Sequence, residues 1–249
     1  REVSYGADLD VLFIGEDVRA AQNLMIAMAQ PTAEGNIWAL DARLRPEGEK
    51  GPVVCSLETY ESYYASRAQL WEMQALTRAR AISGPLKNEF MKVAKAVWRR
   101  ACQDPDLFMK IDDMVQRIRR ERGSGSDFLD IKTGVGGIIE AEFLVQALQM
   151  RANIWEQNWE RAVDGLHQSG HLHKSDVAKL KNSYAFLRRC ELVLRRYDNR
   201  SISTLPSDPD EERNFAIRLG YNEFDAFRRD YLTAREAIHT FYQRRITPA

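Results

Sequence analysis

The chain has 249 residues, of which 44% are hydrophobic and 29% are charged, and this balance is typical of globular domains. It carries 36 Lys and Arg residues and 36 Asp and Glu residues, so its net charge favours neither bulk nucleic-acid binding nor an acidic partner. No apolar run approaches the about 18 residues that a membrane helix needs, and no signal peptide opens the chain, so we expect no membrane association. The 3 cysteines have no paired spacing, which argues against a zinc site or a disulfide framework and fits a reducing cytoplasm.

Two aspartates accompany the first predicted strand. Residues 11–14 form an unbroken apolar run with β-branched and aromatic members, which predicts a buried strand. Gly6 is small enough to let backbone or a ligand approach closely. Because side chains alternate across a strand, Asp8 and Asp10 share one face about 6–7 Å apart, and a hard cation would relieve their repulsion. The alternative interpretation is a solvated strand end with two surface acids.

A second polar strand face follows the first predicted helix. Residues 17–30 have high helix propensity, and residues 36–45 then read as a strand. Alternation places Asp41, Arg43 and Arg45 on one face. If the two strands are neighbours, three carboxylates converge, and they could hold a pair of Mg²⁺ ions while the arginines grip triphosphate oxygens. The alternative is an exposed strand face with surface ion pairs, which stabilise little.

The composition changes from mixed α/β to almost entirely helical near the Gly84-Pro85 break. Before the break, we expect a short strand at 53–55 and a long helix capped by Ser56. The helices expected after it span residues 90–100, 105–122, 137–154, 156–168, 175–197, 209–219 and 223–245. The sequence therefore predicts an α+β fold, with a small mixed-sheet domain over residues 1–84 and an all-α helical bundle over residues 85–249.

A glycine-rich turn at 134–137 precedes one of the predicted helices. Its free backbone amides could bind an anion, but the turn could equally be a tight linker into the helix, and both interpretations stay open. Lys132 could reach a phosphate, although a lone loop lysine is usually solvated. We expect the histidines to be surface or structural residues, because their spacing gives no metal-ligand pattern; they are His167, His171, His173 and His239.

Five ordered motifs resemble those of one known family. They are Gly6-x-Asp8-x-Asp10 followed by the strand Asp41, and residues 31–35, 41–48, 71–80 and 132–146. They resemble the glutamine synthetase adenylyltransferase/deadenylylase family, within the DNA polymerase β-like nucleotidyltransferase superfamily. The motifs cover the chain from residue 4 to about 146, and a looser match continues through residues 187–189 and 204–206.

The resemblance implies a nucleotidyltransferase domain followed by a helical bundle, one of two such pairs in the full enzyme. One pair would attach AMP from ATP to a tyrosine of glutamine synthetase, and the other would remove it by phosphorolysis. Residues 71–80 look more like the adenylylating half. The implied cofactors are Mg²⁺ and ATP, and the implied partners are glutamine synthetase and a PII-type nitrogen signalling protein in the cytoplasm. The catalytic and metal-binding residues would be Asp8, Asp10 and Asp41, and the nucleotide-binding residues Gly6, Arg43, Arg45 and Lys132.

Two features depart from the family pattern. The family has a glycine pair just before the positions of residues 1–2, as part of its phosphate loop, and a longer segment where this chain has residues 16–17. Either the first domain is truncated at its start and lacks a loop, or this copy is degenerate and binds ATP weakly. Phosphorolytic removal of AMP and a non-catalytic half that binds a regulator both stay open as alternatives, although the three aspartates argue against the latter. The sequence also leaves the oligomeric state open.

Overall fold

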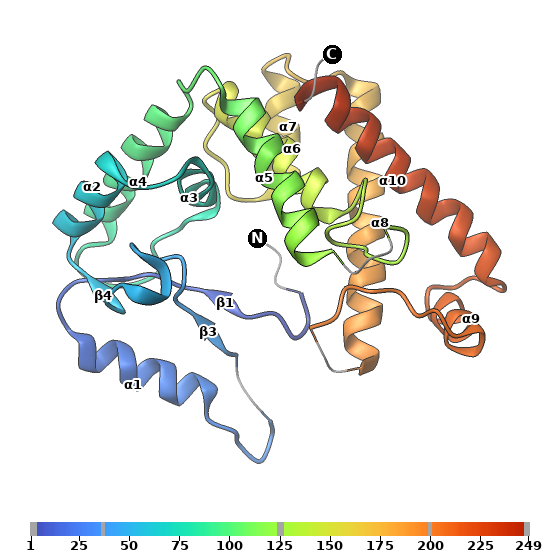
Figure 1. Cartoon of the computed structure of the whole chain (residues 1–249), viewed down its shortest axis with the longest axis horizontal. Coiled ribbons are helices and arrows are strands. Elements are labelled where there is room, and N and C mark those ends of the chain that lie inside the picture. Colours follow the sequence, from blue (N-terminus) through green and yellow to red (C-terminus); the bar gives the residue numbers. More distant parts are fainter. Residues whose placement is uncertain (1–3, 36–37, 124–126, 199–200, 247–249) are drawn as a thin grey trace. The chain divides into compact units, whose positions relative to one another are not determined.

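The computed structural model describes residues 4–35, 38–123, 127–198 and 201–246 (Figure 1). Over these residues it contains ten α-helices and two parallel two-stranded sheets, as expected for an α+β protein. Contacts divide the chain into two compact units. The mixed unit spans Gly6–Ala101, and the helical unit comprises Ser4, Tyr5 and the residues from Cys102 on.

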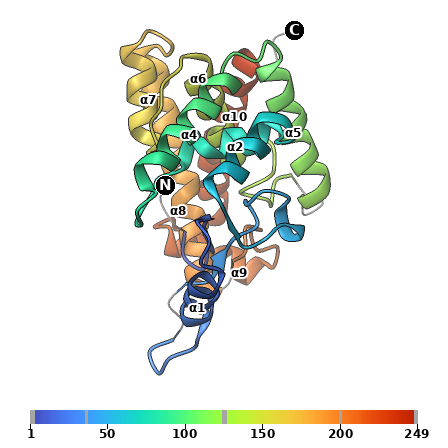
Figure 2. The ribbon, with the colours of Figure 1, turned by 90° about the vertical axis from the view of Figure 1, so that its left-hand side faces the viewer.

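Short strands and four helices make up the mixed unit. Strand β1 (Leu9–Asp10) pairs with β3 (Leu40–Asp41), and β2 (Phe13–Ile14) pairs with β4 (Val54–Cys55). The helices are α1 (Val18–Ala29), α2 (Leu57–Ser66), α3 (Leu70–Ala75) and α4 (Lys87–Ala101), with 3₁₀ turns η1 (Gly48–Lys50) and η2 (Leu76–Arg78). Helix α1 lies on one side of the strands, and α2, α3 and α4 lie on the other (Figures 1 and 2).

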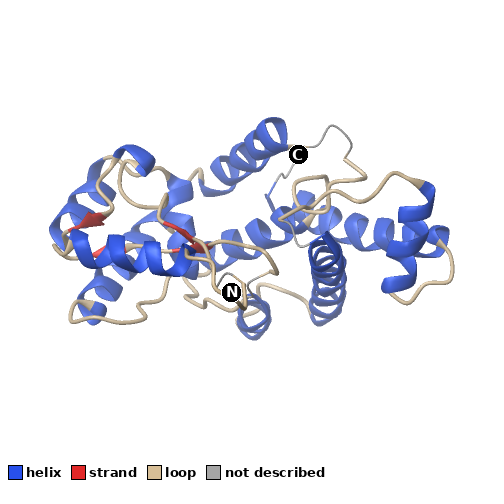
Figure 3. Cartoon of the chain, turned by 90° about the horizontal axis from the view of Figure 1, so that it is seen from below, coloured by secondary structure: helices blue, strands red, loops and turns tan. Residues whose placement is uncertain are grey.

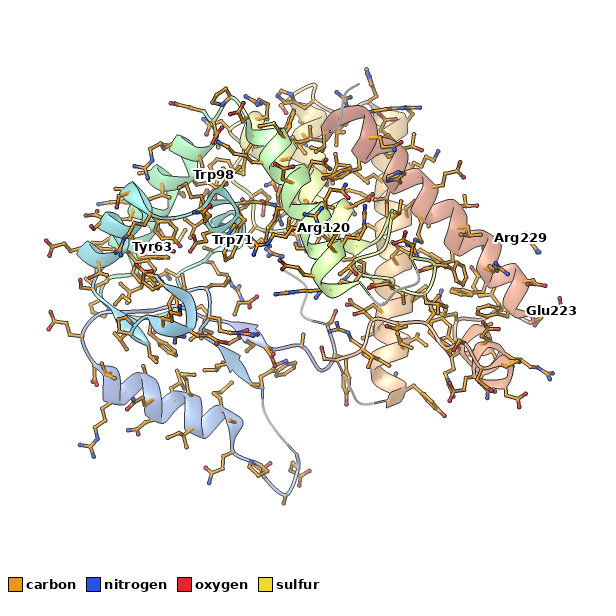
Figure 4. The ribbon with its side chains drawn as sticks, in the orientation of Figure 1. Tyr63, Trp71, Trp98, Arg120, Glu223 and Arg229 are labelled. Atoms are coloured by element: carbon orange, nitrogen blue, oxygen red, sulfur yellow. The ribbon has the colours of Figure 1, made fainter. Side chains whose placement is uncertain are left out.

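The domain boundary predicted between residues 84 and 85 stays a prediction. In the structure, the helix that follows this position, α4, packs against α2 and α3 within the mixed unit. The indole Nε1 of Trp98 donates to Thr77 Oγ1 at 2.8 Å, and the Tyr60 ring meets Phe90 edge-on. Figure 4 shows Tyr63 on α2 and Trp98 on α4. These contacts make α4 part of the aromatic core of this unit.

Local signals explain where two helices of the mixed unit begin. The Ser56 side chain accepts the Thr59 amide at 3.1 Å, which confirms the predicted N-cap of α2. The long helix predicted after this cap is wrong, because α2 ends at Ser66 and α3 begins at Leu70. The Asp17 side chain accepts the Ala20 amide at 2.8 Å and caps α1, which confirms the predicted helix there. Apart from Ala21, no described residue of α1 is buried, and Leu24 and Ile26 are largely exposed.

Two predictions about strands are wrong. The apolar run at 11–14 is half-buried rather than buried: Val11 and Leu12 lie between the strands, and only Phe13 and Ile14 form a strand, β2, in a sheet of two strands. The strand predicted over 36–45 contains only β3 in the described part, since the chain turns after residue 42 and Glu47 adopts a left-handed φ of 63°. Residues 36–37 of that prediction lie outside the described residues. Arg43 and Arg45 therefore do not lie on a strand.

The helical unit is built around one buried helix. Helix α6 packs against α5, α7, α8 and α10, and α8 and α10 also pack together. The helices are α5 (Leu107–Arg122), α6 (Ile138–Arg151), α7 (Trp159–Gln168), α8 (Lys174–Asp198), α9 (Pro209–Arg218) and α10 (Phe224–Ile246). The expected helices are confirmed, with ends that differ by at most three residues.

All strands of the described residues lie in the mixed unit (Figure 3). Among the described residues after residue 90, the structure has no strand and only one isolated bridge, between Asp130 and Thr204, as expected for a helical region. Apolar residues of a helical bundle are expected to face its interior. Leu144, Leu148, Leu187, Leu194 and Phe227 are buried, while Phe143 and Phe186 are half-buried. None of the described helices combines the length and apolar character needed to cross a membrane.

Candidate functional site

The structure brings two of the three predicted aspartates side by side. Asp10 and Asp41 are direct partners in the parallel pair of β1 and β3. The amide of Leu9 donates to the Ala39 carbonyl at 2.9 Å, and the amide of Val11 donates to the Asp41 carbonyl at 2.8 Å. Residues in register on neighbouring strands, about 4.8 Å apart, place their side chains on the same face. The two carboxylates therefore lie on the same face of the strand pair.

Asp8 and Gly6 precede the strand pair. Asp8 is exposed and lies two residues before Asp10. Gly6 is in a turn with a left-handed φ of 65°, a conformation that glycine adopts without strain. In the part of the chain that the structure describes, no three His, Cys, Asp or Glu side chains are close enough together to hold a metal ion. The structure thus aligns Asp10 with Asp41 but does not gather all three carboxylates.

The Arg43 side chain donates hydrogen bonds to both carboxylate oxygens of Asp41. Its Nε donates to Oδ1 at 2.9 Å and to Oδ2 at 2.8 Å, and its Nη2 donates to Oδ2 at 2.5 Å. The backbone amide of Arg43 also donates to Oδ1 at 2.8 Å. These hydrogen bonds from the Arg43 side chain are the main reason that the pKa of Asp41 lies below its usual value of 3.8. Asp41 is therefore ionised at neutral pH.

Arg45 has a different environment from Arg43. Its Nε donates to the Gly51 carbonyl at 2.9 Å and its Nη1 to the Ala42 carbonyl at 2.9 Å. A third bond runs from Nη2 to the Glu49 carbonyl at 3.1 Å. The guanidinium thus closes the loop after β3, and a phosphate contact would require it to leave these carbonyls. The predicted contact of Arg45 with nucleotide stays a prediction.

The glycine-rich turn lies in the helical unit and is tightly packed. The first amides of α6 are already bonded, because Ile138 donates to the Ile131 carbonyl and Ile139 to the Lys132 carbonyl, each at 3.0 Å. A Cβ on Gly136 would lie 2.1 Å from the Arg235 carbonyl oxygen. These contacts favour the tight linker over the anion-binding turn. Lys132 itself is half-buried and belongs to the helical unit, whereas the other predicted site residues belong to the mixed unit.

Sequence reasoning missed the buried ionic groups of the helical unit. The carboxylate of Glu191 accepts hydrogen bonds from Arg188 Nη1 at 2.7 Å and from Ser4 Oγ at 2.7 Å, and it pairs with Arg195 at 2.9 Å. The two arginines lie three and four residues from Glu191 on one helix, and this spacing could have predicted both ion pairs. Ser4 could not be found this way, because its contact is tertiary.

A second buried carboxylate, Glu140, was missed in the same way. It pairs with Arg119, and its Oε2 lies 3.0 Å from His239 Nδ1. These three residues come from α5, α6 and α10, so they join separate helices of the unit. The contact agrees with the prediction that His239 is structural.

Comparisons with known proteins support the resemblance. Residues 15–93 match the family described as glutamate-ammonia ligase adenylyltransferase. Residues 107–246, more than half of the chain, match the family described as GlnD PII-uridylyltransferase. The chain belongs to the glutamate-ammonia ligase adenylyltransferase family, and its helical unit to the GlnD PII-uridylyltransferase family. The adenylyltransferase match includes Asp41 and Arg43 and begins after Asp10.

Curated relatives in the adenylyltransferase family are described as bifunctional glutamine synthetase adenylyltransferase/adenylyl-removing enzymes. The Streptomyces avermitilis protein is 31% identical over 240 residues, which are 88% of this chain and 24% of that protein. The Thioalkalivibrio sulfidiphilus protein is 29% identical over 266 residues, 98% of this chain and 27% of that protein. The Chromobacterium violaceum protein is 31% identical over 247 residues, which are 91% of this chain and 28% of that protein. The chain therefore spans about a quarter of the length of the curated relatives it matches.

Proposed function

We propose that this chain transfers AMP from ATP to a tyrosine of glutamine synthetase. The observation that carries the proposal is the register of Asp10 and Asp41 on neighbouring parallel strands, in a chain of the adenylyltransferase family. Residues 1–84 would then form the nucleotidyltransferase domain, and residues 85–249 the helical-bundle domain. The protein would act in the cytoplasm, in the regulation of nitrogen assimilation.

The donor set fits a divalent cation such as Mg²⁺. Carboxylate oxygens are the ligands that hard cations prefer, and the Asp41 carboxylate already carries a cationic group, the Arg43 guanidinium. We propose Asp8, Asp10 and Asp41 as ligands. When bound, the metal would neutralise charge on the phosphates and lower the pKa of the attacking hydroxyl.

The pKa of Asp41 favours one of its two candidate roles. A general base works best when its pKa is close to the working pH, whereas a ligand must be ionised. Because Arg43 holds the pKa of Asp41 below its usual value, Asp41 suits ligation better than proton abstraction. Arg43, with a side chain that is 61% exposed, is the better placed of the two arginines to neutralise charge on departing pyrophosphate. Gly6, Arg45 and Lys132 stay as proposed nucleotide contacts.

Phosphorolytic removal of AMP is the second candidate. The relatives are named for both the adenylylating and the adenylyl-removing activity. Both reactions exchange the group attached to the same phosphorus of AMP, so one set of carboxylates and arginines could serve either direction. The match of the helical unit to a PII-uridylyltransferase family supports a PII-type signalling protein as a regulator of this chain.

An assay with glutamine synthetase, ATP and Mg²⁺ tests the proposal, with AMP incorporation read by mass. We expect Asp41→Asn and Asp10→Asn to abolish incorporation while the fold persists. Glu61→Gln, a change at an exposed acid on α2, is the matched control and should leave the rate unchanged. Incubation of adenylylated glutamine synthetase with phosphate tests the reverse direction. Full activity of Asp41→Asn in both directions would refute the proposal.

A further inference from the structure

We propose that the Arg43 side chain is a built-in cation that occupies the Asp41 carboxylate until a divalent metal ion displaces it. This inference rests on the proposed function, because it takes Asp41 to be a metal ligand. It adds a competition that controls how readily the metal binds.

The first support is that both oxygens of Asp41 are occupied by the guanidinium. Arg43 Nε bridges Oδ1 and Oδ2 at 2.9 and 2.8 Å, and Nη2 lies 2.5 Å from Oδ2. A metal ion and a guanidinium approach a carboxylate through the same lone pairs, so they compete directly for this group. The metal therefore has to displace at least part of this contact in order to bind Asp41.

The second support is that Arg43 holds Asp41 in two separable ways. Its backbone amide donates to Oδ1 at 2.8 Å, independently of the side chain. The guanidinium can leave while this bond stays, which would keep the carboxylate oriented and expose Oδ2. The competition therefore need not disturb the strand pair that aligns Asp10 with Asp41.

The third support is that Arg43 is held weakly. Its side chain is 61% exposed, although that of Asp41 is only 14% exposed, so water and salt screen the guanidinium end of the pair. Arg45 contrasts with it, because three backbone carbonyls fix that guanidinium. Of these two arginines, Arg43 is therefore the one that can leave its partner at small cost.

Two other acids lie near the Arg43 guanidinium. Arg43 Nη1 lies 3.9 Å from Glu49 Oε1, and Asp8 also attracts Arg43 electrostatically. Phosphate oxygens bind a guanidinium through paired hydrogen bonds. The same side chain would thus cover the ligand while no metal is bound, and would be available to a polyphosphate once the metal has arrived.

A Mn²⁺ titration of the full chain without nucleotide tests the competition, with free Mn²⁺ measured by electron paramagnetic resonance. We expect Arg43→Met to bind Mn²⁺ about two- to fivefold more tightly, the range that corresponds to an exposed ion pair. Arg43→Lys should fall between Arg43→Met and the unmodified chain, because an ammonium neutralises Asp41 without the paired geometry. Arg67→Met is the matched control, since Arg67 is an exposed arginine of the same unit that pairs with Glu47, and it should bind Mn²⁺ as the unmodified chain does.

A second measurement follows the side chain itself. In ¹⁵N spectra, the Arg43 Nε–H signal should shift as Mg²⁺ is added, because its Asp41 acceptor is lost. The shift should be absent in Asp41→Asn. A circular dichroism spectrum of each variant checks that the chain is folded, so that the affinities refer to the native state.

The outcomes separate this inference from the proposed function. If Arg43→Met binds Mn²⁺ no more tightly than the unmodified chain, while Asp41→Asn abolishes AMP transfer, only the inference is overturned. If neither the unmodified chain nor Arg43→Met binds Mn²⁺, the metal ligands of the proposed function and the inference both fail. Tighter binding in Arg43→Met together with an unchanged Arg67→Met supports the inference.

Discussion

The two units contain arginine–carboxylate pairs in opposite settings. In the mixed unit, the side chain of Arg43 is 61% exposed and that of its partner Asp41 is 14% exposed. In the helical unit, the side chains of Arg195 and Glu191 are only 5% and 2% exposed. An exposed pair can be exchanged at small cost, whereas breaking a buried pair leaves a charge in a medium that does not solvate it. The same chemistry therefore permits exchange of partners in the mixed unit and stabilises structure in the helical unit.

The largest effect is expected at the buried carboxylate. Glu191→Ala leaves Arg188 and Arg195 without their shared acid, so the free energy of unfolding should fall by about 3–5 kcal/mol. Urea unfolding followed by circular dichroism measures this loss. Glu58→Gln, at an exposed acid on α2, should change stability by less than about 0.5 kcal/mol. Equal losses in the two variants would remove the contrast between buried and exposed acids.

Substitutions at two glycines, Gly136 and Gly170, test how tightly the helical unit is packed. Gly136 has a φ of 69°, and a Cβ there would lie 2.1 Å from the Arg235 carbonyl oxygen. Gly170 has a φ of 78° but nothing within 4 Å of that position. Gly136→Ala should therefore cost at least about 2 kcal/mol, and Gly170→Ala about 1 kcal/mol from backbone strain alone. Parallel urea titrations compare the two, and similar costs would show that the Arg235 contact yields easily.

A smaller effect is expected at a local contact of the mixed unit. Ser56→Ala removes the acceptor for the Thr59 amide at the start of α2, which should lower the free energy of unfolding by about 1 kcal/mol. Ser56→Asp should restore most of the loss, because aspartate is also a good N-cap. If Ser56→Asp were no better than Ser56→Ala, packing rather than capping would fix the start of the helix.

The smallest effect should come from the exposed pair, and it depends on pH. The folded-state pKa of Asp41 is lowered from 3.8 mainly by the hydrogen bonds from Arg43, so their contribution is present above pH 3.8 and is lost as pH falls through the folded-state pKa. Arg43→Met should raise the pKa of Asp41, as a carboxyl ¹³C NMR titration would show. Its melting temperature should be slightly reduced at pH 7 and equal to that of the unmodified chain at low pH. A difference that persisted at low pH would point to lost packing rather than lost charge pairing.

Sequence patterns predicted the elements that depend on nearby residues. The cap at Ser56 and the helices after residue 85 follow from residue type and periodicity. Alternation along the strands also predicted that Asp10 and Asp41 would lie together if the two strands paired, and β1 does pair with β3. The strand over 36–45 failed because the alternating pattern continues through a turn, in which Arg43 reaches back to Asp41. Contacts between distant segments, such as Ser4 with Glu191, leave no local signal and could not be predicted.

The bond between Ser4 and Glu191 also bears on the order of folding. The two residues are 187 positions apart, so Ser4 has no Glu191 to bind until synthesis has reached α8. At 5–20 residues per second, this interval is roughly 10–40 s, far longer than a helix takes to form. The segment that leads into Asp8 and Asp10 therefore acquires this anchor only late in synthesis, after the helices from α1 to α7 have left the ribosome.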